Sequence, residues 1–197
     1  MSLALKPITT PIQSTALRLA AKRLASRLSV FVAGPLIEKG WGAEELNSRP
    51  ASKLRLTVKD HVEGELQHEV IFGEHRGVAE MGDEHFGSQS SFAIAEMALV
   101  NDVDAIVIIP ASAGSFCELG TWSLVSNLCS KMLIIADKQF DSDQSYLRLG
   151  TLRMAVNGGA TVAWCDYSDG DAVNAHVSEF ISRIHDKVMV RMVTRGD

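Results

Sequence analysis

Five short apolar runs, separated by stretches with helical spacing, constrain the fold of this chain more than any other feature of its sequence. Each run is apolar throughout instead of alternating with polar residues, which indicates a strand buried on both faces, as in a parallel sheet covered by helices. The predicted strands are 29–34 (SVFVAG), 68–73 (HEVIFG), 104–110 (DAIVIIP), 131–137 (KMLIIAD) and 160–166 (ATVAWCD).

A stretch with helical spacing of apolar residues follows each predicted strand or lies between two of them. The predicted helices are 52–65, 89–100, 115–130, 145–156 and 172–190. Strand and helix in alternation predict an α/β fold, a doubly wound five-stranded parallel sheet with helices on both faces. Right-handed crossovers favour the flavodoxin-like or Rossmann-like strand order 2-1-3-4-5.

The beginning of the chain differs in charge from the rest. The first acidic residue is Glu38, and five basic residues precede it, although the net charge of all 197 residues is −5. We expect a basic amphipathic helical extension over 1–28 and one α/β domain over 29–197. A solvated helix is one interpretation of the extension, and a weak contact with a partner protein or nucleic acid is another. A transit peptide is disfavoured because the basic stretch runs directly into a strand.

Three cysteines, Cys117, Cys129 and Cys165, show no CxxC spacing. The sequence therefore predicts neither a disulfide framework nor a zinc site, and we expect no metal and no cofactor. No apolar run approaches the roughly 20 residues that span a bilayer, and no signal-peptide core is present. These observations favour a cytoplasmic protein that does not act at a membrane.

The predicted topology indicates where a ligand would bind. In open α/β sheets, ligands bind outside the carboxyl ends of the strands, at the point where the strand order reverses. With order 2-1-3-4-5 that point lies between the first and third strands, next to loops 34–43 and 111–115. Small residues in the second loop would let a ligand approach the backbone, and the helix that follows would attract an anion.

Glu118 follows this loop and has two interpretations. Ser115-x-x-Glu118 has the spacing of a capping box, in which both side chains only satisfy the start of a helix. Alternatively, Glu118 is the working carboxylate of a site at the strand end. In that case Ser112, Gly114 and Ser115 would hold a phosphate or a ribose, and Gly34 and Pro35 would shape the floor.

Two segments together carry a resemblance to a known family. VFVAGPL (30–36) and NDVDAIVIIPASAGSFCELGTW (101–122) resemble the nucleoside 2-deoxyribosyltransferase-like superfamily, and the second loop also resembles the nucleotide-binding loops of the LOG and SLOG group. The resemblance implies that Glu118 is the nucleophile at the anomeric carbon and that Asp104 helps to hold the base. It also implies a homo-oligomer, and some relatives are effectors of bacterial anti-phage systems, retrons included.

The sequence departs from the family pattern at two positions. Ser112 stands where the transferases carry a second aspartate, and Phe31 is an aromatic residue without the hydroxyl of a tyrosine. For Asp104 the residue pattern alone leaves a second interpretation, a turn residue at the amino end of its strand, far from the pocket.

Two further side chains are candidates on their own chemistry. Glu74 begins the long loop 73–91 and could supply a general acid, although such a loop can also be a solvated surface segment. Trp41 lies between two glycines in the first pocket loop, where it could stack on a base or pack as a lid.

The residues and the resemblance together favour an enzyme that cleaves or transfers an N-glycosidic bond of a nucleoside, a nucleotide or NAD, and the resemblance adds the role of an anti-phage effector. The alternative is a SLOG-like module that senses a nucleotide without turnover. A third interpretation is a scaffold whose basic extension docks a partner.

Overall fold

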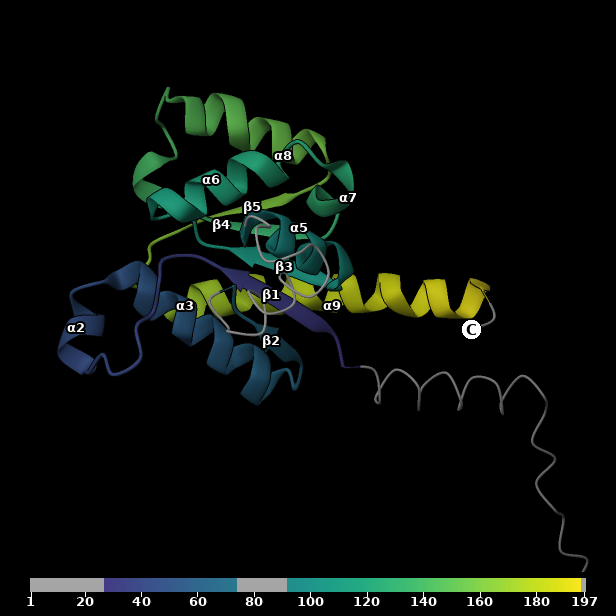
Figure 1. Cartoon of the computed structure of the whole chain (residues 1–197), viewed down its shortest axis with the longest axis horizontal. Coiled ribbons are helices and arrows are strands. Elements are labelled where there is room, and N and C mark those ends of the chain that lie inside the picture. The colour runs from purple at the N-terminus through teal and green to yellow at the C-terminus, as the bar shows by residue number, and fades with distance from the viewer. Residues whose placement is uncertain (1–26, 74–91, 196–197) are drawn as a thin grey trace, which may run out of the picture.

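The computed structural model describes residues 27–73 and 92–195 and contains a five-stranded parallel sheet of order β2-β1-β3-β4-β5 (Figure 1). This confirms the predicted fold class and strand order. The strands are β1 (Ser29–Ala33), β2 (Glu69–Ile71), β3 (Ala105–Ile108), β4 (Met132–Asp137) and β5 (Thr161–Cys165). Each lies within one of the five predicted runs, because those runs are apolar enough to be buried on both faces.

Helices cover both faces of the sheet, as predicted. The helical segments are α2 (Ala43–Asn47), α3 (Pro50–Asp60), η1 (His61–Glu65), α5 (Phe92–Asp102), α6 (Ala113–Trp122), α7 (Ser126–Cys129), η2 (Lys138–Phe140), η3 (Leu147–Leu152), α8 (Arg153–Asn157) and α9 (Gly170–Arg195). The η1 and η3 segments are single stretches of π-helix, and η2 is a 3₁₀ turn.

Alternate residues of each strand enter two separate cores. Val30 and Val32 of β1 pack with the apolar sides of α3, η1 and α9. Phe31 and Ala33 of the same strand pack with α5, α6, α7 and α8 on the other face. The Phe31 ring meets the Trp122 ring edge to face, with centroids 5.8 Å apart. The two cores hold the sheet rigid, so loops at its carboxyl edge have fixed anchors.

The start of the helix after β3 differs from the expectation. The predicted helix 115–130 begins at Ala113 and is divided into α6 and α7. Ser112 is the N-cap and Ser115 occupies the third helical position, so these two serines form the capping box. The capping-box interpretation of Ser115 with Glu118 is therefore wrong, because Ser115 is the third helical residue instead of the N-cap, and Glu118 is the sixth.

The amino-terminal extension lies almost entirely outside the described residues. Leu28, its last predicted residue, belongs to the core and is 1% exposed. Its backbone N–H donates to Nδ1 of His68 at 3.3 Å, and its carbonyl accepts from Glu69. The packed α/β unit therefore includes Leu28.

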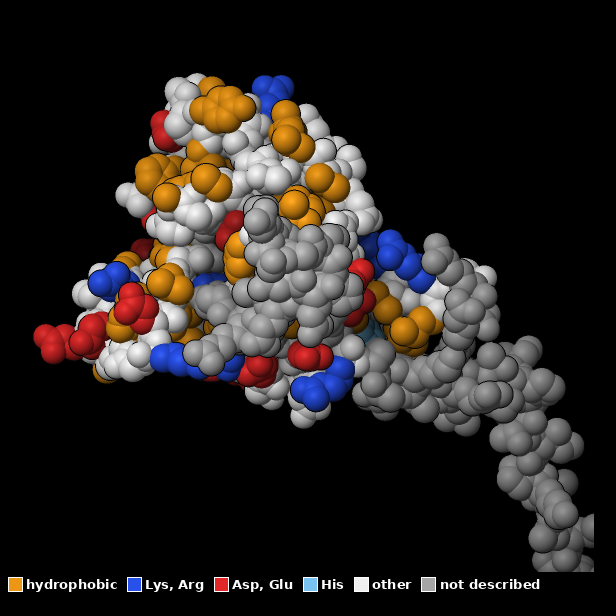
Figure 2. Space-filling model, in the orientation of Figure 1, with side chains coloured by type: hydrophobic (Ala, Val, Ile, Leu, Met, Phe, Trp, Pro, Cys, Tyr) orange, Lys and Arg blue, Asp and Glu red, His pale blue; other side chains and the backbone are white. Residues whose placement is uncertain are grey.

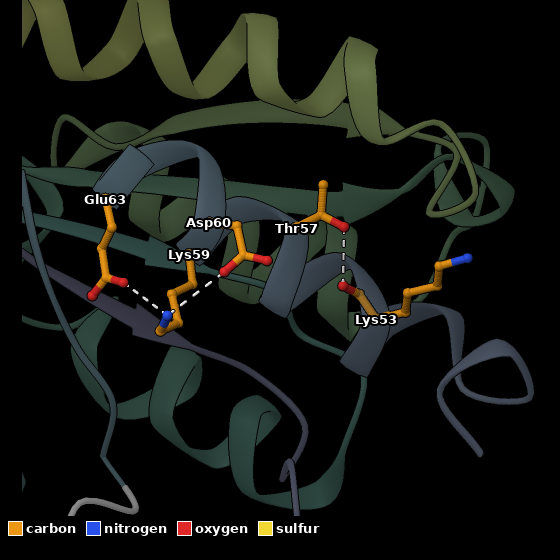
Figure 3. Close-up of polar contacts among 5 residues, drawn as sticks. All are labelled: Lys53, Thr57, Lys59, Asp60 and Glu63. Carbon is orange, nitrogen blue, oxygen red and sulfur yellow. Dashed lines mark hydrogen bonds and ion pairs between the residues drawn. The ribbon is translucent and has the colours of Figure 1, made fainter. Parts of the chain in front are cut away.

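The outer side of α3 carries polar side chains, of which Lys53 and Asp60 are exposed and Thr57 and Lys59 are half-buried (Figure 3). Nζ of Lys59 lies 2.7 Å from Oε2 of Glu63 and 3.6 Å from Oδ1 of Asp60, and the hydrogen bond to Glu63 is the main cause that raises the pKa of Lys59. The Thr57 hydroxyl donates to the carbonyl of Lys53 at 3.2 Å. The opposite side of the helix, with Leu54 and Arg55, is buried.

The layer of α5 to α8 carries much exposed apolar surface, visible over α6 and α8 in Figure 2. Its exposed large apolar side chains are Phe92, Ile94, Phe116, Leu124, Phe140, Tyr146, Leu149, Met154 and Val156. Exposed apolar groups in number often mark contact surfaces. The homo-oligomer that the resemblance implies stays a prediction.

Candidate functional site

Two cavities adjoin at the carboxyl ends of β1 and β3, where the topology predicts a ligand. The smaller has a volume of about 300 Å³ and the larger about 600 Å³. Leu36, in the loop after β1, and Ser112, at the start of α6, line both. The site thus consists of two neighbouring chambers that share these two lining residues.

Among the described residues, three charged side chains line the smaller cavity: Glu118 of α6, Glu96 of α5 and Arg55 of α3. Glu118 lies in the second turn of α6 and is half-buried, and its Oε2 atom is shielded from solvent. Because Ser112 and Ser115 already cap the helix, the capping role that competed with a chemical role for Glu118 is filled by other residues. Its carboxylate is placed at the cavity instead.

The small-residue loop before Glu118 is held by its own hydrogen bonds. The Ser115 hydroxyl accepts from the amides of Ala111 at 3.0 Å and Ser112 at 2.9 Å, and Ser115 N donates to the Ser112 hydroxyl at 3.2 Å. Ser115 is 1% exposed. Its hydroxyl therefore shapes the loop, while Ser112 and Gly114 present the loop to the cavity.

Glu96 is a site residue that the sequence analysis missed. It is 6% exposed, and its carboxylate packs against the end of β2, where a Cβ added to Gly73 would lie 2.5 Å from Oε1. The absence of a side chain at Gly73 leaves the space that this carboxylate occupies. The signal that could have found Glu96 is an acid inside the otherwise apolar run FAIAEMALV.

Arg55 was also missed, although its side chain ties three elements together. It is 2% exposed, its Nε and Nη2 donate to the Val32 carbonyl at 3.1 and 2.8 Å, and its Nη1 donates to the Pro35 carbonyl at 3.0 Å. Its guanidinium carbon lies 4.4 Å from the Phe72 ring centroid. Arg55 fixes the loop after β1 and places a positive charge beside the cavity that contains two carboxylates.

Gly34 lines the smaller cavity, and the side chains of Arg55 and Ile109 approach it closely. A Cβ at Gly34 would lie 3.1 Å from Cδ of Arg55 and 3.4 Å from Cβ of Ile109. A side chain at this position would push against the buried guanidinium.

The larger cavity has a different chemical character. Aromatic rings from four segments line it: Trp41, Phe116, Phe140 and Tyr167. Glu38 and Asp137 add carboxylates, and Arg49 places its guanidinium 4.4 Å from the Trp41 ring centroid. Burial, and then the charge of Asp137, raise the pKa of Tyr167, so its phenol stays neutral and donates to the Ile135 carbonyl at 3.0 Å.

Comparison with known proteins decides the family. The sequence model of the STM3845 retron effector protein matches residues 52–194, which is most of the chain. The chain belongs to this retron effector family. The matched region contains Arg55, Glu96 and Glu118, whereas the loop with Gly34, Pro35 and Trp41 precedes it.

A curated relative of this chain comes from Escherichia coli. Over 66 residues it is 39% identical, and its name proposes a ribosyltransferase/DNA-binding protein of retron Ec86. The matched stretch covers 34% of this chain and 22% of the relative. The chain thus spans about a fifth of that relative's length. Among solved structures, the flavoenzyme NAD(P)H:acceptor oxidoreductase FerB from Paracoccus denitrificans covers 81% of this chain and 98% of its own, with 13% identity and a TM-score of 0.47.

The predicted site residues of this chain separate into five groups. Gly34, Gly114, Ser115 and Glu118 line the smaller cavity, Pro35 and Trp41 line the larger, and Ser112 lines both. Glu74 lies outside the described residues. Asp104 lines neither cavity.

Asp104 lies at the amino end of β3, at the opposite edge of the sheet from the site. Its Oδ2 accepts hydrogen bonds from the amide of Ser29 at 2.9 Å and from its hydroxyl at 3.0 Å. The base-holding role that the resemblance implies for Asp104 does not fit this position, and the structure gives the carboxylate the role of joining the starts of β1 and β3.

Within residues 27–73 and 92–195, no three His, Cys, Asp or Glu side chains are grouped as metal ligands would be. In the same described part of the chain, none of the helices combines the length and apolarity that crossing a bilayer requires.

Proposed function

We propose that this retron effector cleaves or transfers an N-glycosidic bond of a nucleoside, a nucleotide or NAD, with Glu118 as nucleophile or as stabiliser of the oxocarbenium charge. The observation that carries the proposal is that two carboxylates, Glu118 and Glu96, line the same cavity. This cavity lies between β1 and β3, where the strand order of the sheet reverses. Pairs of carboxyl groups around a sugar are the usual machinery of glycosidic bond cleavage.

In the proposed reaction, the bond between the anomeric carbon and the base nitrogen breaks, and its electron pair leaves with the base. Glu118 either forms an ester with the anomeric carbon or stabilises its positive charge. Glu96, in its protonated form, gives a proton to the departing base. Water or a second base then attacks the anomeric carbon and either breaks the ester bond, which releases the Glu118 carboxylate, or neutralises the oxocarbenium ion. The Glu96 carboxylate takes the proton that the attacking group loses. Glu74 remains a second candidate for the same acid role.

The remaining residues would position the substrate. Ser112 and Gly114, at the amino end of α6, are placed to meet a ribose hydroxyl or a phosphate. Gly34 and Pro35 would form the floor beneath the sugar, and Arg55 would offset the negative charge of the two carboxylates.

The comparisons support this proposal at a coarser level. The family is one of retron effectors, and the Escherichia coli relative carries ribosyltransferase in its name. Transfer of that activity to this chain is part of the proposal, as is an anti-phage role, because the two proteins match over a fraction of the relative's length.

A product screen tests the proposal. Purified protein is incubated with ribonucleosides, deoxynucleosides, their phosphates and NAD, and free base is measured by chromatography. We expect base release by the wild type and a loss of about 10²-fold or more in Glu118→Gln. Glu179→Gln, an exposed position on α9, is the matched control and should keep full activity.

A binding assay with the same panel of compounds separates the proposal from nucleotide sensing. The aromatic lining of the larger cavity favours ligand binding whether or not a bond is cleaved. Binding of a panel member to both wild type and Glu118→Gln, with no free base from either, would support a sensing module and contradict the proposed chemistry.

A further inference from the structure

A single nucleoside at Glu118 leaves the larger cavity without a role. The smaller cavity, at about 300 Å³, is at the lower end of the range for small-molecule sites, and the larger has about twice that volume. Among the described residues, four aromatic side chains line the larger cavity and two, Phe31 and Phe92, line the smaller. An account of the substrate therefore has to include what the larger cavity binds.

The first turns of α6 form the wall between the two cavities. Phe116 lines the larger and Glu118 the smaller. Residues i and i+2 of an α-helix are rotated by about 200° around its axis, so the side chains of Phe116 and Glu118 leave the helix on opposite sides. Leu36 and Ser112 line both cavities, so a ligand at Glu118 can continue over them into the aromatic chamber.

The chemistry of the larger cavity fits a heteroaromatic base that carries N–H donors. Trp41, Phe116, Phe140 and Tyr167 offer ring surfaces for stacking. The carboxylates of Glu38 and Asp137 can accept hydrogen bonds from exocyclic amines. Asp137 is held in place, since it accepts from the backbone amide of Gln139 at 3.0 Å and from the side-chain amide at 2.7 Å.

Cationic groups contribute little to this chamber among the residues that the structure describes. Arg49 is the cationic side chain in its lining, and its guanidinium lies over the Trp41 ring. The chamber is therefore suited to a base and poorly suited to a second phosphate.

We propose that the larger cavity is a second nucleobase subsite for an amine-bearing base, and that the substrate carries two linked nucleotide units. One unit places its sugar at Glu118 and the other places its base among the four aromatic rings. The inference rests on the proposed function for the first unit. The second unit could come from a free dinucleotide or from a neighbouring position in a single strand of nucleic acid.

Equilibrium binding to the Glu118→Gln variant, which removes turnover, tests the subsite directly. The probes are AMP, the dinucleoside monophosphate ApA, NAD, and a single-stranded oligodeoxyadenylate of about ten nucleotides. We expect ApA or NAD to bind about tenfold or more tightly than AMP, as one additional stacked base allows. The oligomer identifies the source: tighter binding than both dinucleotides indicates a strand, and equal or weaker binding indicates a dinucleotide.

Aromatic variants made in Glu118→Gln assign the gain to the proposed subsite. Phe116→Ala and Phe140→Ala should remove the advantage of two-unit probes and leave AMP binding within about twofold. Phe92→Ala, whose ring lines the smaller cavity, is the matched control and should keep that advantage. Circular dichroism of each variant verifies that it is folded.

Equal affinity for AMP and every two-unit probe would overturn the subsite, as would an advantage that survives both aromatic variants. Either result leaves the proposed function intact if the wild type still releases base from a nucleoside. Conversely, tight two-unit binding without base release from any substrate would contradict the chemistry and support the subsite.

Discussion

At the scale of single residues, the buried Ser115 hydroxyl holds the loop before α6 in place through hydrogen bonds to its backbone. It accepts hydrogen bonds from two backbone amides, those of Ala111 and Ser112. Ser115→Ala would leave both amides without this acceptor, so we expect the free energy of unfolding to fall by about 1–3 kcal/mol. Urea unfolding measures the change. Ser182→Ala, at an exposed position of α9, is the control, and an equal effect in both variants would contradict the assignment.

His68 makes the stability of the molecule dependent on pH. Burial lowers its pKa, and the positive charges of His185 and Arg27 act in the same direction, against a smaller opposite effect of Asp104. The neutral ring accepts the Leu28 amide and stacks on His185 with centroids 6.0 Å apart. The folded chain therefore binds this proton less readily than the unfolded chain does.

The sign of the pH effect follows from that lowered pKa. The contribution of His68 is fully present above its ordinary pKa of about 6.5 and is lost as the pH falls through the lowered value. We expect the urea midpoint to decrease between about pH 7.5 and pH 5, and His68→Asn to flatten that decrease. His176→Asn, at an exposed position of α9, should leave the slope unchanged, and a slope insensitive to His68→Asn would count against this origin.

At the scale of elements, the contact between the end of β2 and α5 positions the second carboxylate. A Cβ at Gly73 would lie 2.5 Å from Oε1 of Glu96 and 3.3 Å from Cζ of Phe31. Gly73→Ala should therefore displace the Glu96 carboxylate and reduce base release by about tenfold or more, in line with the loss of a positioned acid. Steady-state kinetics measures this effect.

Gly64→Ala is the control for that substitution, because no atom of the described part of the chain outside this helical turn lies within 4 Å of a Cβ added to this glycine of η1. It should retain wild-type turnover. A Gly73→Ala variant that is folded and fully active would show that the position of Glu96 against β2 does not matter to the reaction.

The elements also show what could be predicted from the sequence and what could not. The strands were predictable because each apolar run is buried on both faces, a pattern that local sequence records. The start of α6 was misplaced because Ser112 and Ser115 are both good N-cap residues, and the end of β3 decides between them. Glu96 and Arg55 were missed because their importance arises from contacts with Gly73, Val32 and Pro35, which are distant in sequence.

At the scale of the whole molecule, the residues at the carboxyl ends of the strands and those at the amino ends have different roles. The carboxyl edge carries both cavities, whereas Asp104, His68 and His185 join strands and helices near the amino edge. The described chain enters at that amino edge through Arg27, whose Nε donates to the Gln67 carbonyl at 3.1 Å, and through the buried Leu28. We therefore expect changes in residues 1–26 to have little direct effect on the two cavities.

Removal of residues 1–26 tests this separation of the extension from the α/β domain. We expect the shortened chain to unfold cooperatively, with a melting temperature close to that of the full chain, and to release base within about twofold of the rate of the full chain.

Leu28→Ala in the full chain is the contrasting variant, because Leu28 is 1% exposed in the core. Its truncation should lower the free energy of unfolding by about 2–5 kcal/mol. Calorimetry and the base-release assay measure both. A shortened chain that is folded but inactive would place the extension in the function of the site, whereas one that fails to fold would make it part of the core.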